Sequence, residues 1–340
     1  MNRELSVSIV TSAHWEGDPR LNRHVRYLRA AGVQSDLVSF ADRGRIRGLL
    51  AALGAIVRSH SAVVILPDPE LFPLGSIAAL IGRSKAVIDI HEDYPEAVAS
   101  RIWIPALLRP LVRVVADIAI RVGRKIAWRV IVAAPELRQS GDWLVANIPD
   151  PSFFEVDENV KSHRLVYVGD ITESRGALEM VDVLGALGDR FELTLIGMIH
   201  PRLKVTLKER AQTQGVAEQL ILTGRLDHQE AWIRASGALA GLCLLRPVPA
   251  YMDAVATKLW EYMALGLPAI VSDLPGQSAI MSEIDPMLTC SNIEKVVEVV
   301  KDLAQDRSRR TSISRKSRQM VERRWSEQRP DRAIQEAVSP

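Results

Sequence analysis

Residues 165–176 read LVYVGDITESRG and carry the pattern that decides the fold. Leu165–Val168 is apolar on both faces of a strand, Gly169 permits a tight turn, and Arg175 stands at the start of the next helical stretch. A buried strand that runs through a glycine turn into a helix is typical of a parallel sheet with helical crossovers. The stretch therefore predicts an α/β protein.

The same alternation of strand and helix runs along the whole chain. Helical patterns such as Arg20–Ala31, Ile46–Ser59 and Ile104–Ala127 separate short apolar runs. The runs predict parallel strands at Val7–Thr11, Gln34–Ser39, Ala62–Leu66, Ala86–Ile90, Val130–Ala134, Leu165–Val168, Leu193–Ile196, Leu220–Leu222, Leu239–Leu244 and Ala269–Val271. Two doubly wound, Rossmann-like sheets follow from this order, and ligands of such sheets bind beyond the carboxyl ends of the strands.

The chain has 340 residues, which suits two domains of medium size. Asn147–His163 breaks the alternation with prolines and polar residues, so we expect the domain boundary there. The predicted domains are residues 1–150 and residues 151–325. A last helix, 326–340, follows, and its return to the first domain is left open.

Composition indicates an ordinary globular protein, with 47% hydrophobic and 25% charged residues and a net charge of +2. The first strand follows the N-terminus without a secretion-signal pattern, and no apolar run approaches the ~20 residues that span a bilayer. Cys243 and Cys290 lie in separate apolar segments without metal-ligand spacing. These features predict a cytoplasmic protein with buried free thiols.

Several function classes lose support because their motifs are absent. The chain has no G-x-G-x-x-G after a strand and no G-x-x-x-x-G-K-[ST], which disfavours a dinucleotide site and a P-loop. His91-Glu92-Asp93-Tyr94-Pro95 lacks the second histidine of a zinc-protease helix. Only 5% of residues are aromatic and none interleave with a basic patch, so nucleic-acid binding is disfavoured.

Residues 257–268, TKLWEYMALGLP, predict a helix that ends at Gly266 and Pro268. Lys258 and Glu261 then lie near its start, where an anion meets both an ammonium and a helix N-terminus, and a carboxylate can accept hydrogen bonds from ribose hydroxyls. Arg175 has the planar fork that matches phosphate oxygens. The alternative is a helix whose Lys258 and Glu261 simply face water.

Five segments, in order, are similar to family 4 of the retaining GT-B glycosyltransferases, and the resemblance covers nearly the whole chain. They are Asp18-Pro19-Arg20, residues 87–96 (VIDIHEDYPE), Asn147-Ile148-Pro149-Asp150, residues 166–176 and residues 258–268. The resemblance implies two facing Rossmann-like domains with an interdomain cleft. It also implies transfer of a sugar from a nucleotide-diphosphate sugar to a glycan or lipid-linked acceptor, in polysaccharide or glycolipid synthesis.

The resemblance also assigns roles to particular residues. His91 and Asp253 match positions that touch the transferred sugar, and Glu261 matches the residue that contacts the ribose. Donor binding is expected at Gly169, Arg175, Lys258, Glu261, Arg225 and Leu226, with Gly224-Arg225-Leu226 near the base. Acceptor-side positions are Asp18, Arg20, Glu92 and Asp93. The alternative for His91 is a histidine that caps a strand end by hydrogen bonds.

This sequence departs from the family at three places. Asp170 stands where an arginine is common, and we expect Lys258 to offset this carboxylate beside a diphosphate. Asp253 is one methylene shorter than the usual glutamate, and residues 12–17, SAHWEG, replace a glycine-rich loop that bears on the acceptor. Asp170 and Asp253 favour the alternative of a catalytically impaired homologue that serves as a binding partner in a polysaccharide assembly complex.

The expected chemistry needs no metal and no cofactor. Arg175, Lys258 and the amides near Ala254–Ala256 would stabilise the departing nucleoside diphosphate, and the resemblance implies retention by same-face attack. A metal-dependent alternative rests on four carboxylates, Asp68, Glu70, Glu92 and Asp93.

Residues 103–127 predict a membrane-facing helix. Arg109, Arg113, Arg121 and Lys125 recur at multiples of four, Trp103 precedes the helix, and a separate apolar face holds Leu107, Leu111, Val114, Ile118 and Val122. A basic amphipathic helix of this kind can lie on anionic lipid, which favours peripheral association with the inner face of the cytoplasmic membrane. The alternative is an ordinary helix that packs its apolar face on the sheet.

Overall fold

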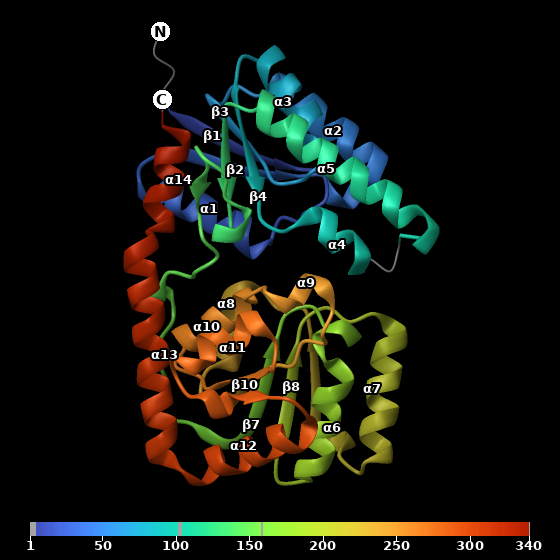
Figure 1. The fold of residues 1–340 in the computed structure, drawn as a ribbon, viewed down its shortest axis with the longest axis vertical. Helices are drawn as coiled ribbons and strands as arrows, with labels where there is room; N and C mark the ends of the chain where they lie inside the picture. Colours follow the sequence, from blue (N-terminus) through green and yellow to red (C-terminus); the bar gives the residue numbers. More distant parts are fainter. Residues whose placement is uncertain (1–4, 101–103, 158, 340) are drawn as a thin grey trace. The chain divides into compact units, whose positions relative to one another are not determined.

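The computed structural model describes residues 5–100, 104–157 and 159–339, so Trp103 lies outside the described residues. The chain divides into two compact units, shown along the colour gradient in Figure 1. Unit 1 comprises Met1–Asn147 with Glu327–Pro340, and unit 2 comprises Ile148–Ser326. The last helix of the chain therefore groups with the first unit.

Unit 1 is built on a six-stranded parallel sheet with the order β2-β1-β3-β4-β5-β6. The strands are β1 (Ser6–Thr11), β2 (Gln34–Ser39), β3 (Val63–Leu66), β4 (Lys85–Ile90), β5 (Arg129–Val132) and β6 (Trp143–Leu144). The helices are α1 (Pro19–Ala30), α2 (Arg45–Arg58), α3 (Leu71–Ile81), α4 (Tyr94–Ser100), α5 (Arg109–Ile126) and α14 (Pro330–Val338). Helix α14 packs against α1, β5 and β6.

Unit 2 has a second six-stranded parallel sheet with the order β12-β11-β10-β7-β8-β9. Its strands are β7 (Lys161–Val168), β8 (Glu192–Ile196), β9 (Leu220–Gly224), β10 (Ala238–Cys243), β11 (Ala269–Ser272) and β12 (Thr289–Cys290). Its helices are α6 (Ala177–Leu187), α7 (Pro201–Thr213), α8 (His228–Ala235), α9 (Pro249–Met252), α10 (Thr257–Ala264), α11 (Pro275–Ser282), α12 (Ile293–Gln305) and α13 (Arg307–Gln328), which runs into the boundary with unit 1. The prediction of two doubly wound, Rossmann-like sheets is confirmed.

The predicted strands are all present, and the described structure has two further short strands that were not predicted. Strands β6 and β12 have two residues each, too few for any periodicity to appear in the sequence. The helix predicted over Ile104–Ala127 begins regular α-geometry only at Arg109, after a 3₁₀ turn at Ala106–Leu108. In the described part of the chain, no helix is long and apolar enough to cross a membrane.

Helix α10 ends as the sequence predicts. Gly266 has φ +69° and its N–H donates to the carbonyl of Met263 (3.0 Å), while the N–H of Leu267 donates to that of Tyr262 (2.9 Å). This pair of bonds is a Schellman motif, which needs a left-handed residue and therefore favours glycine. The motif returns the chain directly into β11, so the start of α10 is fixed beside the strand ends.

Each sheet has one point where the strand order reverses. In unit 1, β1 lies between β2 and β3, so successive strands are added on opposite sides of it. In unit 2, β7 lies between β8 and β10 in the same way. Crossover connections diverge at such a point and leave a crevice outside the carboxyl ends of the two central strands, where ligands of α/β sheets bind. The β1–β3 end and the β7–β10 end are therefore the places to examine for chemistry.

Candidate functional site

Gly169 follows β7 at the reversal point of unit 2. Its φ of +131° lies in the region that side chains rarely adopt, and a Cβ there would lie 3.2 Å from Nζ of Lys258. A side chain at this position would have to displace the lysine ammonium. The glycine thus allows the backbone of the strand end and the ammonium to lie close together.

Lys258 is the second residue of α10, so its ammonium and the first amides of the helix share one end. Nζ donates a hydrogen bond to Oη of Tyr167 (2.6 Å) and lies 4.0 Å from the centroid of the same ring. Burial, followed by the positive charge of Arg175, lowers the pKa of Lys258 to about 8. An ammonium that its surroundings destabilise in this way gains from any anion that binds beside it.

Arg175 ends a 3₁₀ turn, Glu173–Arg175, and only Gly176 separates it from α6. Its Nη1 lies 3.6 Å from the carboxylate of Asp170 and 3.4 Å from the backbone oxygen of the same residue. The Asp170 side chain is 61% exposed, so this ion pair is weak. Arg175 makes the ion pair with Asp170, and compensation of this carboxylate by Lys258 beside a diphosphate stays a prediction.

Glu261 lies one turn further along α10 and is buried, with 6% of its surface exposed. Its Oε1 is 3.1 Å from Nε2 of His228, the first residue of α8, and Nε2 also lies 3.2 Å from Nε1 of Trp232. One imidazole nitrogen carries either a proton or a lone pair, so it cannot donate to Glu261 and accept from Trp232 at once. His228 was not predicted, because helix α8 reaches Glu261 only through the tertiary fold.

The other donor-side residues lie at further strand ends of the same sheet. Arg225 follows β9, is exposed, and places Nη1 3.1 Å from Sδ of Met198. Leu226, next to it, is half-buried. Asp253 ends the short helix α9 and is exposed. The contacts thus join Gly169, Arg175 and Lys258 in one cluster, while a role for Arg225, Leu226 and Asp253 in donor binding stays a prediction.

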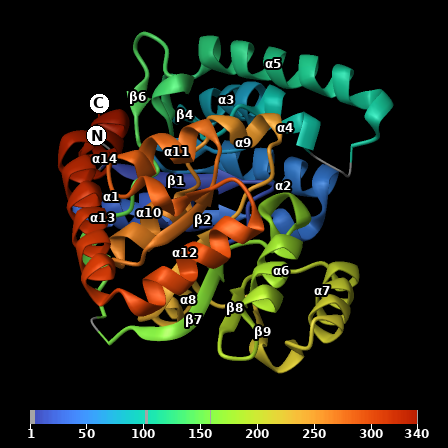
Figure 2. The same cartoon turned by 60° about the horizontal axis from the view of Figure 1, so that its bottom comes forward.

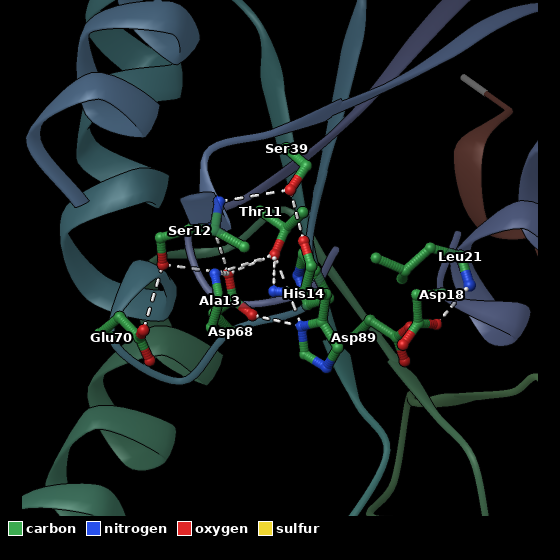
Figure 3. Close-up of polar contacts among 12 residues, drawn as sticks. Thr11, Ser12, Ala13, His14, Asp18, Leu21, Ser39, Asp68, Glu70 and Asp89 are labelled. Carbon is green, nitrogen blue, oxygen red and sulfur yellow. Dashed lines mark hydrogen bonds and ion pairs between the residues drawn. The ribbon is translucent and has the colours of Figure 1, made fainter. Parts of the chain in front are cut away.

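In unit 1 the reversal point holds a buried carboxylate, Asp68, just beyond the end of β3 (Figure 3). Its Oδ2 accepts hydrogen bonds from Oγ1 of Thr11 (2.8 Å), from N and Oγ of Ser12 (2.6 and 3.1 Å) and from N of Ala13 (3.3 Å). Oγ of Ser12 also lies 3.1 Å from a carboxylate oxygen of Glu70, so its single hydrogen is donated to either Asp68 or Glu70. Burial raises the pKa of Asp68, but these donors and a neighbouring histidine lower it overall.

That histidine is His14, whose Nδ1 lies 2.6 Å from Oδ1 of Asp68. Burial lowers the pKa of His14, but the hydrogen bond and charge of Asp68 outweigh burial and raise it above the ordinary value. The side chain is 25% exposed, and Figure 3 shows its second nitrogen turned away from Asp68. An imidazole held by a carboxylate at one nitrogen is able to accept a hydrogen bond or a proton at the other.

His91 follows β4 and joins the same cluster. Its ring lies 5.1 Å from that of His14, edge to face, and Oη of Tyr94 lies 3.1 Å from its Nδ1. Burial lowers the pKa of His91, so the ring is neutral near pH 7. Asp93 accepts a hydrogen bond from the backbone of α4 (3.1 Å), and Glu92 is half-buried beside it. Contact of His91 with a donor sugar stays a prediction.

Asp18 and Arg20 have structural contacts. Asp18 caps α1, with its Oδ1 accepting from two backbone N–H groups of the first turn (2.9 and 3.1 Å). The buried guanidinium of Arg20 binds both oxygens of Asp89 (3.0 and 2.7 Å), the carbonyl of Val145 (3.0 Å) and Oδ1 of Asn147 (2.8 Å). These contacts account for both residues without a ligand, and an acceptor role for them stays a prediction.

The four carboxylates of the metal-dependent alternative do not form a metal cluster. Across the described residues, no group of three or more His, Cys, Asp or Glu is arranged to hold a metal ion. Asp68 and Glu70 meet at the hydroxyl of Ser12 instead, and Asp93 caps a helix.

Comparison with known proteins agrees with this geometry. The family model of the glycosyl transferases group 1 matches residues 150–320, and no curated protein matches the sequence. Sucrose-phosphate synthase from Thermosynechococcus elongatus is similar in structure (TM-score 0.72, 14% identity, 97% of each chain). Anabaena HepE, solved in complex with UDP and glucose, is similar along 99% of each chain (TM-score 0.72, 11% identity). A glycosyltransferase from Rickettsia africae has a TM-score of 0.67 at 14% identity over 99% of this chain and 98% of its own.

At such identities the solved structures establish only the fold, which is the two-domain GT-B class along the whole chain. The family assignment comes from the matched residues 150–320, which contain β7, the cluster around Lys258, and Glu261. Because this match spans half of the chain, the protein belongs to the glycosyl transferases group 1 and is a glycosyltransferase.

Proposed function

We propose that this glycosyltransferase transfers a sugar from a nucleotide-diphosphate sugar to a glycan or lipid-linked acceptor, with retention of configuration and without a metal. The observation that carries the proposal is the pair of cations at the reversal point of unit 2. Arg175 and Lys258 lie close enough for the charge of one to lower the pKa of the other. The solved complex of Anabaena HepE with UDP-glucose supports the same ligand class.

The diphosphate would bind between Arg175, Lys258 and the first amides of α10. Arginine offers a planar pair of donors to phosphate oxygens, and the helix N-terminus adds a partial positive charge. Gly169 would allow phosphate oxygens to approach the backbone of the strand end. Glu261 has a second carboxylate oxygen beyond its contact with His228 and would accept from the ribose hydroxyls. Arg225 and Leu226 would lie beside the base.

Cleavage of the sugar–phosphate bond leaves additional negative charge on the nucleoside diphosphate. Preorganised cations at that position are worth about 3–4 kcal/mol each to the barrier. Two such cations supply the charge stabilisation that a divalent metal would otherwise give, so we expect transfer to persist in excess EDTA. In same-face attack the leaving phosphate oxygen would accept the acceptor proton, and Asp253 would orient the donor sugar.

NMR of the anomeric proton in the product tests the proposed retention. A product of inverted configuration would contradict same-face attack.

The direct test of the proposed function is a thermal-shift screen against UDP, GDP, ADP and TDP sugars. A ligand at about 100 times its Kd stabilises by about 2.7 kcal/mol, which corresponds to roughly 5–10 °C in Tm for units of this size. We expect one nucleotide to give this shift, and Arg175→Ala to abolish it. Exposed Arg202 on α7 provides the control variant Arg202→Ala, which should keep the shift. The absence of a shift with every nucleotide would contradict the proposal.

A further inference from the structure

Three helices of unit 1 lie side by side, with α3 packed between α2 and α5 (Figures 1 and 2). The inward sides of these helices pack on the hydrophobic core of unit 1. Ala52 and Ile56 of α2 and Phe72 of α3 belong to the core, and Ala116 and Ile120 of α5 pack against it. The outward sides of these helices therefore need no apolar residues for folding.

The outward sides are nevertheless apolar. Ile46 of α2 is 75% exposed, Ile81 of α3 is 67% exposed, and Leu107, in the 3₁₀ turn that leads into α5, is 91% exposed. We call the exposed apolar set the outer face, and it consists of Ile46, Leu50, Val57, Leu74, Ile77, Leu80, Ile81, Leu107, Leu108, Leu111, Val114, Val115, Ile118 and Val122. Single exposed apolar residues are normal on soluble proteins, but a group on three adjacent helices indicates an interaction surface.

Helix α5 shows most clearly that these apolar side chains face outward. Of the five apolar positions predicted for one face, Leu107 lies in the 3₁₀ turn before α5 and the other four lie on α5. All five are exposed, from 91% at Leu107 to 37% at Val122. The alternative, in which that face packs on the sheet, is wrong for these side chains, because Ala116, Ile120 and Gly123 make the inward contacts instead. Gly123 lies so close to Phe72 that a Cβ would come within 2.5 Å of it.

The charges on the same helices are predominantly basic, although Arg113 forms an ion pair with Glu96 of the adjacent helix α4. Helix α3 has no charged residue, and the sequences of α2 and α5 contain one acid, Asp117, which pairs with Arg121 (2.9 Å). The exposed basic residues of these helices are Arg45, Arg47, Arg58, Arg113, Arg121 and Lys125. An apolar centre with basic residues around it is complementary to a layer of anionic headgroups over an apolar interior.

We propose that the outer face docks unit 1 on an anionic lipid bilayer. Apolar side chains would enter the headgroup boundary while arginine and lysine bind phosphates. A second copy of the chain fits less well, because a self-complementary contact would bring like charges together across the interface. In this proposal the protein binds the surface of the bilayer and does not cross it.

The test is co-sedimentation of the whole protein with vesicles made of equal parts phosphatidylglycerol and phosphatidylcholine. We expect binding at low salt, weaker binding at high salt, and little binding to phosphatidylcholine alone. The double variant Leu111→Asn/Ile118→Asn should reduce the vesicle-bound fraction at least tenfold, since each side chain loses apolar burial in lipid. Both side chains are exposed, so the variant leaves the core unchanged.

The matched control is Ile233→Asn, which replaces an exposed side chain (67%, compared with 62% for Leu111 and 52% for Ile118) on α8 of unit 2 and should pellet like the wild type. Equal pelleting of the double variant and this control would overturn the proposal, as would failure of the wild type to pellet. Sedimentation velocity without lipid provides another check. A dimer that the double variant dissociates would show that a second copy covers the outer face. The nucleotide thermal shift should be the same in the wild type, the double variant and the Ile233→Asn control. Failure of the lipid-docking proposal is therefore distinct from failure of the proposed function.

Discussion

The two sheets of this protein reverse their strand order at comparable places and surround those places with opposite charge. In unit 1 a buried carboxylate, Asp68, receives hydrogen bonds from the loop after β1 and fixes His14. In unit 2, Arg175 and Lys258 repel one another. The buried carboxylate of unit 1 is satisfied by the protein itself, whereas the two cations of unit 2 have an exposed ion pair with Asp170 and a hydrogen bond to Tyr167 to offset their repulsion, and would gain from a bound anion. From this difference we expect the reversal point of unit 1 to hold a side chain in position and that of unit 2 to hold an anionic ligand.

The largest expected effect is on the free energy of unfolding, when a buried ion pair of unit 1 is broken. Arg20→Met removes one partner of a buried ion pair and leaves Asp89 uncompensated, which should lower the free energy of unfolding by about 3–5 kcal/mol. Urea denaturation measures the change. The control is Arg323→Ala, because its pair with Glu283 is exposed on both sides and should contribute at most about 1 kcal/mol. If the two variants lost the same free energy of unfolding, the buried charges of unit 1 would have no special role in stability.

The cations of unit 2 should behave in the opposite way. Arg175→Ala and Lys258→Ala should each lower kcat/KM by about 100- to 1000-fold, because each removes a charge that stabilises the leaving diphosphate. Their free energies of unfolding should stay within about 1 kcal/mol of the wild type, since removal of either cation relieves repulsion. Steady-state kinetics with the nucleotide sugar found in the thermal screen provides the measurement. A Lys258→Ala enzyme with near-wild-type activity would refute the role of this lysine.

Donor affinity should depend on the protonation of Lys258. The pKa of this ammonium in the free protein is about 8, so binding of a diphosphate must be accompanied by proton uptake above that pH. We expect the Kd of the nucleoside diphosphate to rise by nearly tenfold for each pH unit above about 8. Isothermal titration between neutral and alkaline pH measures it. Lys258→Arg keeps its charge and should flatten the dependence, and a steep slope in that variant would assign it to another group.

The smallest effect should be a pH dependence of stability at the reversal point of unit 1. The raised pKa of His14 means that its contribution is complete below pH 6.5 and is lost as the pH rises through the folded value. The lowered pKa of Asp68 means that its contribution is present above pH 3.8 and is lost on further acidification.

The stability of the wild type relative to His14→Gln should therefore be greatest between about pH 4 and 6.5 and should decline by about 1 kcal/mol at higher pH, since a charged hydrogen bond is roughly twice as strong as a neutral one. Chemical denaturation at several pH values measures the difference. A constant difference across the range would show that the two side chains do not form a charged pair.

Much of the fold followed from local sequence. The alternation of apolar runs and helical patterns predicted every strand of four or more residues, because buried parallel strands are continuously apolar. Gly266 and Pro268 marked the end of α10, and the position of Lys258 and Glu261 on that helix followed directly. Gly169 and Arg175 likewise belong to one short segment, so local spacing was enough to place both of them just after the end of β7.

The contacts that the sequence did not predict all join distant segments. His14 and Asp68 are 54 residues apart and meet because β1 and β3 are neighbours in the sheet, an order that no local pattern specifies. His228 reaches Glu261 across 33 residues. The sequence by itself determined which segments are strands and helices, since burial and backbone geometry act over a few residues. Only the tertiary structure decided which strand ends share an edge and that the apolar face of α5 stays uncovered, because both depend on how far-separated elements pack.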